Sequence, residues 1–567
     1  MRRRSWSGLA ALKTYRQIHP SSATCLLESA SSVGGVWATH RLWDGLKSNN
    51  MRGTYEYSDF PMDDSFGVQH GEHIPGHVVQ RYLERYAEHF QLTACIRLNS
   101  RVTTVEHHDD TTWTVTYVDA TGQDVGVHTR RLILATGITS QPYLPAIAGQ
   151  DSFNRPLFHT VDMPAHLKPT IQQPHHRIAV LGATKSAWDA VYAAATAGAH
   201  VDWIIRDNGH GPCWMAPPYV TPLRRWLEKL VTTRLLTWFS PCIWLDSRAE
   251  RPGSSVRRFL HGSWLGRKIT DCFWTTLAND VVSLNRFDSH PELAKLKPWI
   301  SPFWVASGLS ILNYATNFFD LVTAGKVSIH VDHITHLAPD TVHLANSPAL
   351  PNISALIVAS GWSPSPNITF HPPSLPSQLG FPNAPDPLPA SLSAAADRDI
   401  LSRFPRLADR PAHASPATYT PLAQDAQTET QSLHPYRLTR FMVPASSLAA
   451  ERSIAFMGVA MTINTPLLAQ TQALWIAAFF SDKLSLRSIT TETSLHTQFG
   501  IHRYPGGLGR RNPDFVFDAI PYVDVLLRDL GIEPGRKTGW RRCVEAYGVE
   551  DYRGLVEEWL GVNGMKY

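Results

Sequence analysis

Residues 177–207 form an unbroken strand–turn–helix–strand pattern, and this pattern constrains the fold more than any other feature of the chain. An apolar run, RIAVL, leads to a turn at Gly182, then to the alanine-rich stretch KSAWDAVYAAATA and a second apolar run, HVDWII. Short apolar runs on either side of a helical pattern are typical of parallel strands buried on both faces. The segment therefore predicts a βαβ unit and an α/β fold with a parallel sheet.

The glycine turn of this unit predicts a nucleotide site. The sequence GATKSA keeps the first glycine of the motif G-x-G-x-x-G and has small residues at the other two glycine positions. Backbone N–H groups at a helix start hold a pyrophosphate. Arg206, at the tip of the second strand, favours a 2′-phosphate and hence NADP over NAD; a solvated charge at a strand end is the alternative. The candidate residues are Gly182, Thr184, Lys185, Ser186, Ala187 and Arg206.

A second nucleotide motif at the start of the chain is incomplete. In MRRRSWSGLAALK only the last glycine, Gly8, is present, and the first two glycine positions fall on Arg3 and Ser5. Only Met1 and Arg2 precede these positions, which is too short for the strand that should stand there. A second strand, ATCLLE, ends in Glu28, 20 residues after Gly8, where complete motifs place an acid that binds a ribose. The alternative is a surface helix followed by an unrelated strand.

Composition excludes several classes of protein. The chain has 567 residues and a net charge of +4 without a basic run, so we expect two or three domains and no nucleic-acid partner. Its six cysteines form no C-x-x-C pair, which predicts neither a metal site nor a disulfide framework. There is no apolar run of about 18 residues and no apolar signal core. We expect a cytoplasmic protein without a signal peptide or a transmembrane span.

Two further apolar strands end in glycine, RLILATG at 131–137 and ALIVASG at 355–361, and they complete the prediction of two nucleotide-binding halves. Residues 203–304 hold nine of the 18 tryptophans at roughly helical spacing, which predicts a helical lid. The rings either fill the core of that segment, line a substrate pocket, or form a peripheral membrane face with Arg224, Arg225, Arg257 and Arg258. Residues 363–431, rich in Pro, Ser and Ala, predict a partly disordered excursion.

Several segments resemble the class B flavin-containing monooxygenases. VGGVWATHRLWDGLKSNNMRGTYEYSDFPM at 33–62 is similar to their G-G-x-W turn followed by a T-N-like step and S-D-F-P. FNRPLFH at 153–159 stands where they carry a signature ending in histidine, with Arg155 replacing its glycine. Residues 436–444 and 454–458 are similar to their flavin-closing segment. With its long Trp-rich insertion, the chain looks most like the fungal members that tailor polyketides.

The resemblance implies two Rossmann-like domains and two cofactors. NADPH would reduce FAD, and the reduced flavin with O2 would form a C4a-hydroperoxide that transfers one oxygen atom to a hydrophobic, polyketide-like secondary metabolite. Asn49 is the best catalytic candidate because an amide hydrogen-bonds a peroxide without protonating it, and His159 is the second.

The resemblance also implies the residues of the flavin site and the domain bounds. The implied flavin-site residues are Gly8, Glu28, Val36, Trp37, Ser48, Asn49, Phe456 and Gly458. The expected domains are a discontinuous FAD-binding domain (1–165 and 433–567), an NADPH-binding domain (166–362, with a helical insertion over about 207–310) and a Pro/Ser/Ala-rich insertion (363–432).

The departures from the family pattern leave other functions open. Met163 stands where Baeyer–Villiger members carry tryptophan, which disfavours ketone oxidation to an ester. Gln470 stands where an acid is common. The alternatives are a non-oxygenating FAD/NADPH oxidoreductase and a remnant that binds FAD poorly because its first strand is missing. The substrate and the oligomeric state do not follow from the sequence.

Overall fold

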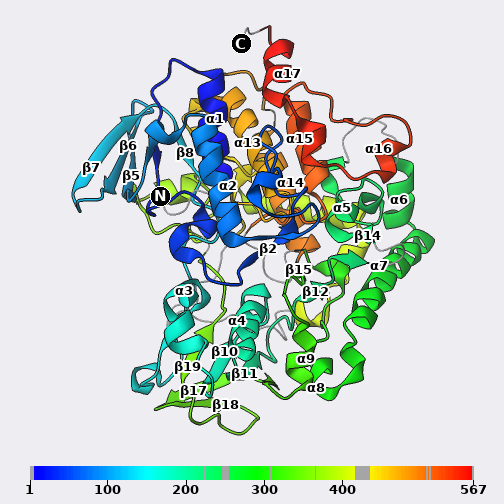
Figure 1. Cartoon of the computed structure of the whole chain (residues 1–567). Coiled ribbons are helices and arrows are strands. Elements are labelled where there is room, and N and C mark those ends of the chain that lie inside the picture. Colours follow the sequence, from blue (N-terminus) through cyan, green and yellow to red (C-terminus); the bar gives the residue numbers. More distant parts are fainter. Residues whose placement is uncertain are drawn as a thin grey trace.

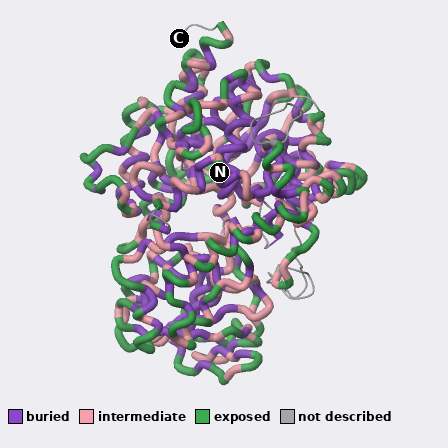
Figure 2. The backbone as a smooth tube through the Cα atoms, turned by 90° about the vertical axis from the view of Figure 1, so that its right-hand side faces the viewer, coloured by how far each residue is buried: buried purple, intermediate pink, exposed green. Residues whose placement is uncertain are grey.

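The computed structural model describes residues 6–220, 225–245, 254–306, 308–363, 365–414, 434–486, 488–505, 509 and 512–564. Three positions discussed above, Arg3, Ser5 and Arg224, lie outside this range. The chain forms an α/β molecule with a larger body that contains most of the helices and a smaller body, below it in Figure 1 and in the turned view of Figure 2, built on a parallel sheet.

The smaller body contains the predicted βαβ unit. Strand β10 (Arg177–Leu181) leads through α4 (Lys185–Thr196) to β11 (His200–Ile205), and the two strands pair in parallel. They belong to a five-stranded sheet with the order β16-β11-β10-β19-β9, in which all pairs are parallel. The other strands are β16 (Val327–Val331), β19 (Ala355–Val358) and β9 (Leu157–His159).

Both faces of this sheet are covered, which explains why its strands are almost continuously apolar. On one face, residues of α4 and α9 (Phe318–Thr323) form a core with Trp188 and Trp203. On the other face, the hairpin β17 (Ile334–Ala338) and β18 (Thr341–Leu344) packs over Leu356 and Ile204. The predicted βαβ unit is therefore confirmed as part of a parallel sheet with both faces covered.

The larger body is assembled from distant parts of the chain. Strand β8 (Leu132–Leu134) pairs in parallel with β23 (Ile454–Phe456), while α1 (Trp6–Ile18) packs against α13 (Thr465–Phe480). A second parallel pair joins β1 (Leu26–Leu27) to β4 (Ile96–Arg97). These two pairs belong to separate sheets, and no strand of the described residues connects them.

The remaining elements of this body surround that centre (Figure 1). A four-stranded sheet has the order β20-β5-β6-β7. Its strands are β20 (Thr369–His371), β5 (Arg101–His107), β6 (Trp113–Val118) and β7 (Asp124–Thr129). Other elements are β2 (Lys47–Met51), β3 (His73–Pro75), α2 (Gly76–His89), β21 (Leu438–Thr439), β22 (Val443–Pro444), α12 (Leu448–Glu451), α14 (Ile489–Arg503), α15 (Ala519–Asp529), α16 (Arg541–Val544) and α17 (Leu555–Val562). The short helix α3 (Met163–His166) belongs to the smaller body (Figure 1), where Met163 packs in one core with Trp188.

The Trp-rich insertion is less purely helical than expected. It contains short strands as well as helices: Trp214–Ala216, for example, pairs in parallel with Leu309–Ile311. Most of its tryptophans, including Trp214, Trp244, Trp274 and Trp304, are buried, so they fill a core, while Trp264 is exposed. Its elements are β12 (Trp214–Ala216), β13 (Tyr219–Val220), β14 (Arg225–Trp226), α5 (Leu227–Val231), α6 (Ser254–Gly262), α7 (Trp264–Leu284), α8 (Pro291–Ala294) and β15 (Leu309–Ile311).

The Pro/Ser/Ala-rich segment is folded where it is described. Residues 365–414 contain α10 (Leu375–Gln378) and α11 (Ala390–Arg403), and α11 packs against α14. Ile400 and Leu407 are fully buried there. The predicted disordered excursion is thus wrong for residues 365–414, because widely spaced apolar residues bury enough surface to order a proline-rich stretch. Among all described helices, none is both long and apolar enough to cross a membrane.

A buried carboxyl group makes the stability of this fold depend on pH. Asp518, the residue before α15, lies in an aromatic cluster with Trp244 and Tyr504, and burial raises its pKa to about 7. The folded protein therefore binds this proton more tightly than the unfolded chain. The contribution of Asp518 to stability is full below pH 4 and is lost as the pH rises to about 7.

We expect Asp518→Asn to remove this dependence. Between pH 4 and pH 7, the free energy of unfolding of the variant should gain up to about 4 kcal/mol relative to the wild type, measured by denaturant unfolding at each pH. Asp109→Asn, at an exposed position, serves as the control and should follow the wild type. Parallel pH curves for Asp518→Asn and the wild type would contradict the assignment.

Candidate functional site

Three distant segments meet at the start of α1. Gly458, which follows β23, has φ +74°, and a Cβ built on it would lie 3.1 Å from Ser7 Oγ and 3.5 Å from Gly137 Cα. Gly137 follows β8 and Ser7 lies in the first turn of α1, where Gly8 is buried. The two parallel strands and the helix therefore present a surface of backbone and small side chains. Such a surface at a helix N-terminus fits the pyrophosphate of a dinucleotide.

Glu28 lies where a ribose-binding acid is expected. It directly follows β1, its side chain is fully buried, and its Oε1 accepts a hydrogen bond from Ala30 N at 2.9 Å. The backbone of Glu28 is held on both sides, by Arg97 O and Ser100 N. The acid is thus fixed at the end of a strand, as the sequence predicts.

The G-G-x-W turn holds its tryptophan through a tyrosine. Residues 35–37 form a short 3₁₀ turn, in which Val36 is exposed and Trp37 is partly buried. Trp37 Nε1 donates to Tyr55 Oη at 3.2 Å, and the Tyr55 ring packs edge-on against Trp6 at 4.7 Å. The turn is therefore tied to the start of α1.

Strand β2 carries the candidate catalytic amide and is held from several sides. Asn49 Nδ2 donates to Ser310 Oγ at 3.0 Å, and Ile74 N donates to Ser48 Oγ at 3.1 Å. Asn313 Nδ2 donates to the carbonyl oxygens of Lys47 and Ser48, both at 3.1 Å. Asn313 also accepts a hydrogen bond from Lys185 of α4, so it joins β2 to the smaller body.

A buried glutamate of the Trp-rich insertion completes this junction. Glu228 Oε1 accepts from Asn50 Nδ2 and from Thr54 Oγ1 (2.9 Å), and its Oε2 accepts from Met51 N (3.0 Å) and Trp226 Nε1 (2.8 Å). Its exposed fraction is 2%, and burial raises its pKa against the effect of these hydrogen bonds. The four donors can be satisfied together only by an acceptor with two oxygens.

The amide of Asn50 also connects β2 to the flavin-closing segment. Asn50 Nδ2 donates to Ile463 O at 2.9 Å, five residues after Gly458. Beside this contact lies a cleft with about 450 Å³ of space, open to solvent, whose lining includes Thr54, Lys229 and Asn464. Residues from β2, the insertion and the closing segment therefore share one region.

The turn of the βαβ unit fits a second dinucleotide. Gly182 has φ +129°, and a Cβ there would lie 2.7 Å from Ala359 O, so only glycine fits. Thr184 is the N-cap of α4, Thr184 and Ser186 are exposed, and Ala187 is buried. Open helix N–H groups at this turn suit a phosphate.

Lys185 points away from the expected phosphate position toward the domain junction. Its ammonium group pairs with Asp189 and donates to Asn313 Oδ1 at 3.0 Å. It also lies 4.7 Å from the centre of the Tyr314 ring. Lys185 therefore supports Asn313, which in turn binds β2.

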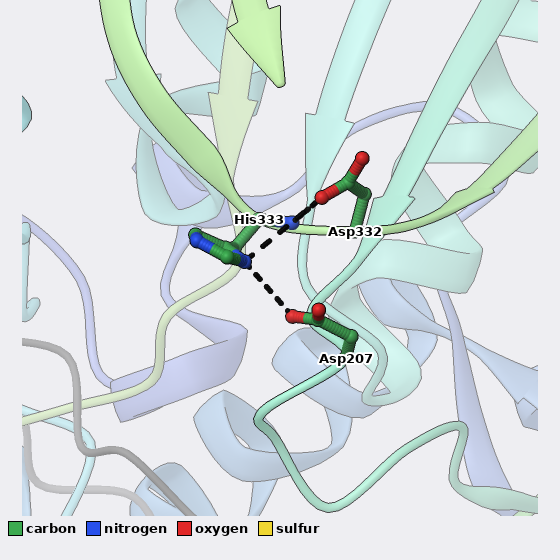
Figure 3. A group of neighbouring side chains, drawn as sticks. All are labelled: Asp207, Asp332 and His333. Atoms are coloured by element: carbon green, nitrogen blue, oxygen red, sulfur yellow. Dashed lines mark hydrogen bonds and ion pairs between the residues drawn. The ribbon is translucent and has the colours of Figure 1, made fainter. Parts of the chain in front are cut away.

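Arg206 stands at the edge of the sheet beside the charged cluster of Figure 3. Its Nη1 donates to Asn208 Oδ1 at 3.1 Å. In the cluster, His333 Nδ1 lies 3.0 Å from Asp207 Oδ1 and 3.9 Å from Asp332 Oδ1 (Figure 3). Asp207 and Asp332 follow the neighbouring strands β11 and β16, so the cluster marks the carboxyl edge, where such sheets bind ligands.

Two other candidates, His159 and Phe456, make contacts that are typical of residues with a structural role. His159 ends β9, is 1% exposed, and its Nδ1 accepts from Val161 N at 3.1 Å, so it caps the next turn. Its ring packs edge-on against Trp362 at 4.9 Å. The Phe456 ring packs against Phe381 at 5.8 Å within the core.

Gln470 is hydrogen-bonded to the S-D-F-P segment. Gln470 Oε1 accepts from Ser58 N at 2.9 Å, and its Nε2 donates to Asp59 Oδ1 at 2.8 Å. Asp59 also pairs with Lys13 of α1 at 2.7 Å. An acid at position 470 would repel Asp59, so the amide suits this partner.

Sequence reasoning missed Glu228, Ser310 and Asn313. Ser310 and Asn313 stand in the largely apolar run GLSILNYA, whereas Glu228 lies between Arg225 and Lys229 in the mixed stretch LRRWLEKLV. A polar residue in an apolar run is a usable signal because, once buried, it needs partners. The partners of these residues in β2, however, lie more than 170 residues away in the chain.

Comparisons with known proteins identify the family. Residues 60–233 match the family described as pyridine nucleotide-disulphide oxidoreductase. The chain is 30% identical over 581 residues to the FAD-dependent monooxygenase resA of Aspergillus sclerotiorum, covering 98% of this chain and 96% of that protein. It is 31% identical over 556 residues to an FAD-dependent monooxygenase of Pyrenophora dematioidea, covering 94% of this chain and 97% of that protein. The chain belongs to the family of FAD-dependent monooxygenases.

A solved structure shows the same fold. Cyclohexanone monooxygenase from Rhodococcus sp. Phi1 bound to NADP+ superposes with a TM-score of 0.57 at 14% identity, covering 94% of this chain and 96% of that one. The predicted fold class, two Rossmann-like domains with a discontinuous FAD domain, is confirmed. The predicted enzyme class, a flavin-dependent monooxygenase using FAD, is confirmed at the level of the family. The use of NADPH by this chain stays a prediction.

The Glu228 contacts predict a large effect of its removal. Glu228→Ala removes the carboxylate that four donors share, so the free energy of unfolding should fall by about 2–3 kcal/mol, measured in denaturant. Amide hydrogen exchange in residues 47–54 should accelerate. Glu88→Ala, on the exposed side of α2, is the matched control and should change stability by less than about 0.5 kcal/mol. Unchanged exchange of β2 in Glu228→Ala would show that the carboxylate does not hold the strand.

Proposed function

We propose that this enzyme inserts one oxygen atom from O2 into a hydrophobic small molecule, with Asn49 at the site of oxygen transfer. The observation that carries the proposal is the position of β2, whose residues are bound by the closing segment, the insertion and the segment after β15. FAD, when bound, would pass two electrons from NADPH to O2, so that one oxygen atom of O2 enters the substrate and the other leaves as water. The residues of this chain provide binding, orientation and exclusion of water.

Two separate surfaces support the assignment of the cofactors. Gly8, Gly458 and Glu28 would hold the pyrophosphate and ribose of FAD, with Val36 and Trp37 beside the ring. Gly182, Thr184, Ser186 and Ala187 would hold NADPH at the start of α4, with Arg206 at the 2′-phosphate. Lys185 would act indirectly, through Asn313.

Asn49 suits oxygen transfer because an amide donates a hydrogen bond and does not release a proton. Its Nδ2 is already directed by Ser310, so little reorganisation is needed. His159 would act as a positioning residue at the junction rather than as a proton donor, since its Nδ1 caps a turn.

The substrate class is part of the proposal. The cleft beside Glu228 combines the apolar side chains of Leu467 and Val549 with the polar Lys229 and Thr232. This lining suits a hydrophobic molecule with polar substituents, as a polyketide-like secondary metabolite would be. The family is named for its oxygenase activity, so we place this substrate in an oxygenation rather than a dehydrogenation.

Labelled dioxygen tests the reaction directly. Purified protein loaded with FAD is given NADPH, ¹⁸O2 and a panel of hydrophobic aromatic and polyketide-like compounds, and products are examined by mass spectrometry. We expect one labelled oxygen atom in the product of an accepted compound. Asn49→Ala should still oxidise NADPH but release the oxygen mainly as hydrogen peroxide. An oxidised product without the label would favour the non-oxygenating oxidoreductase instead.

Arg206 predicts the choice of nicotinamide cofactor. Arg206→Ala removes a charge-assisted contact to the 2′-phosphate, so KM for NADPH should rise about 10- to 100-fold while KM for NADH stays unchanged. The measurement is steady-state NAD(P)H oxidation. Arg130→Ala, at an exposed position away from this edge, is the control. Equal effects on both cofactors would contradict a 2′-phosphate contact.

A further inference from the structure

Exposed apolar side chains gather on the hairpin formed by α6 and α7, at the right edge of the molecule in Figure 1. We call residues 255–269 the α6–α7 tip. Trp264 is 68% exposed and Leu265 is 53% exposed, next to each other at the start of α7. Val256, Phe259 and Ile269 are each about 40% exposed. These side chains recur at helical spacing, so each helix presents them on one face.

The tip is a rigid feature whose inner side is already packed. A Cβ on Gly266 would lie 2.0 Å from Phe259 O, so the two helices touch backbone to backbone. Ser263 Oγ caps α7 by accepting from Gly266 N at 3.0 Å. On the inner side, Trp274 Nε1 donates to Phe239 O at 2.8 Å, and His261 bonds to Trp238 O at 3.0 Å. The exposed apolar side chains are therefore not needed for the hairpin's own core.

The charge of the tip has one sign. Residues 254–270 contain Arg257, Arg258, Arg267 and Lys268 and no acid. Burial lowers the pKa of His261 to about 4, so that imidazole adds no charge at neutral pH. The next acid along the chain, Asp271, is paired with Arg406 at 3.2 Å. Exposed aromatic and aliphatic side chains thus stand among cations.

A second exposed tryptophan belongs to the same region. Trp540, just before α16, is 74% exposed, and Arg541 follows it. The segment is joined to the tip through residues 235–238, because Leu235 N donates to Cys543 O at 2.9 Å and Trp238 O accepts from His261. In Figure 1, α16 and α6 lie at the same edge.

We propose that the α6–α7 tip binds the protein peripherally to an anionic lipid surface. Tryptophan and leucine beside lysine and arginine are the composition of helices that lie in a membrane interface, where rings enter the headgroup region and cations meet lipid phosphates. A second copy of the chain is a poorer occupant. A symmetric contact through the tip would bring cations against cations, and lysine is depleted from the cores of protein interfaces.

Vesicle sedimentation with the full-length protein tests the proposal. The probes are vesicles of phosphatidylcholine alone and of phosphatidylcholine with phosphatidylserine in a ratio of about two to one. We expect binding to the anionic vesicles that weakens as salt is raised, and little binding to the neutral ones. The double variant Trp264→Ser with Leu265→Ser should weaken binding at least about tenfold. Arg258→Glu with Lys268→Glu should abolish the preference for anionic lipid, since each cation contributes about fivefold.

The control and the contrary outcomes are defined by the same assay. Val562→Ser removes an apolar side chain that is 58% exposed on α17, outside the tip, and should bind as the wild type does. Circular dichroism and NADPH oxidation of each variant show whether it folds. Equal sedimentation of folded wild-type and tip variants, or no sedimentation of the wild type, would overturn the proposal. So would a wild-type dimer in solution that the Trp264→Ser, Leu265→Ser variant converts to a monomer.

Discussion

The arrangement of the site depends on the hydrogen bonds that hold strand β2. A short strand with two adjacent asparagines offers polar groups on both faces, and buried polar groups require partners. Asn49 is bound by Ser310 on one side, and Asn50 is bound by Glu228 and Ile463 O on the other. These partners come from distant segments of the chain, and Asn313, which binds the β2 backbone, also accepts from Lys185 of the smaller body, so the contacts of β2 join the two bodies.

The Trp-rich insertion is more than the helical lid that its sequence predicts. Its tryptophans mostly fill a core, while its polar residue Glu228 reaches into the junction and its outer helices carry the exposed tip. One segment thereby combines a packed interior, inner contacts to β2 and an exposed apolar surface. Its inner contacts hold the strand of the proposed catalytic amide, and its outer face carries the proposed lipid-binding tip.

The sequence predicts those parts whose signals are local. The βαβ unit at 177–207, Glu28 at a strand end and the glycine at 182 all follow from apolar runs and turn chemistry, and the structure places them as expected. Glu228, Ser310 and the folded proline-rich segment do not follow. Their roles depend on contacts between residues far apart in the chain, such as Met51 and Glu228. Hydrophobic periodicity is a local signal and does not predict such contacts.

We propose that the FAD and NADPH sites meet at β2, and flavin reduction without oxygen tests this proposal most directly. Purified protein that retains FAD is mixed with NADPH under anaerobic conditions, and the visible absorbance of the flavin is followed. The account predicts that the absorbance bleaches, and that NADPH reacts faster than NADH. A colourless preparation that takes up no FAD, or a bound flavin that NADPH does not reduce, would contradict the account.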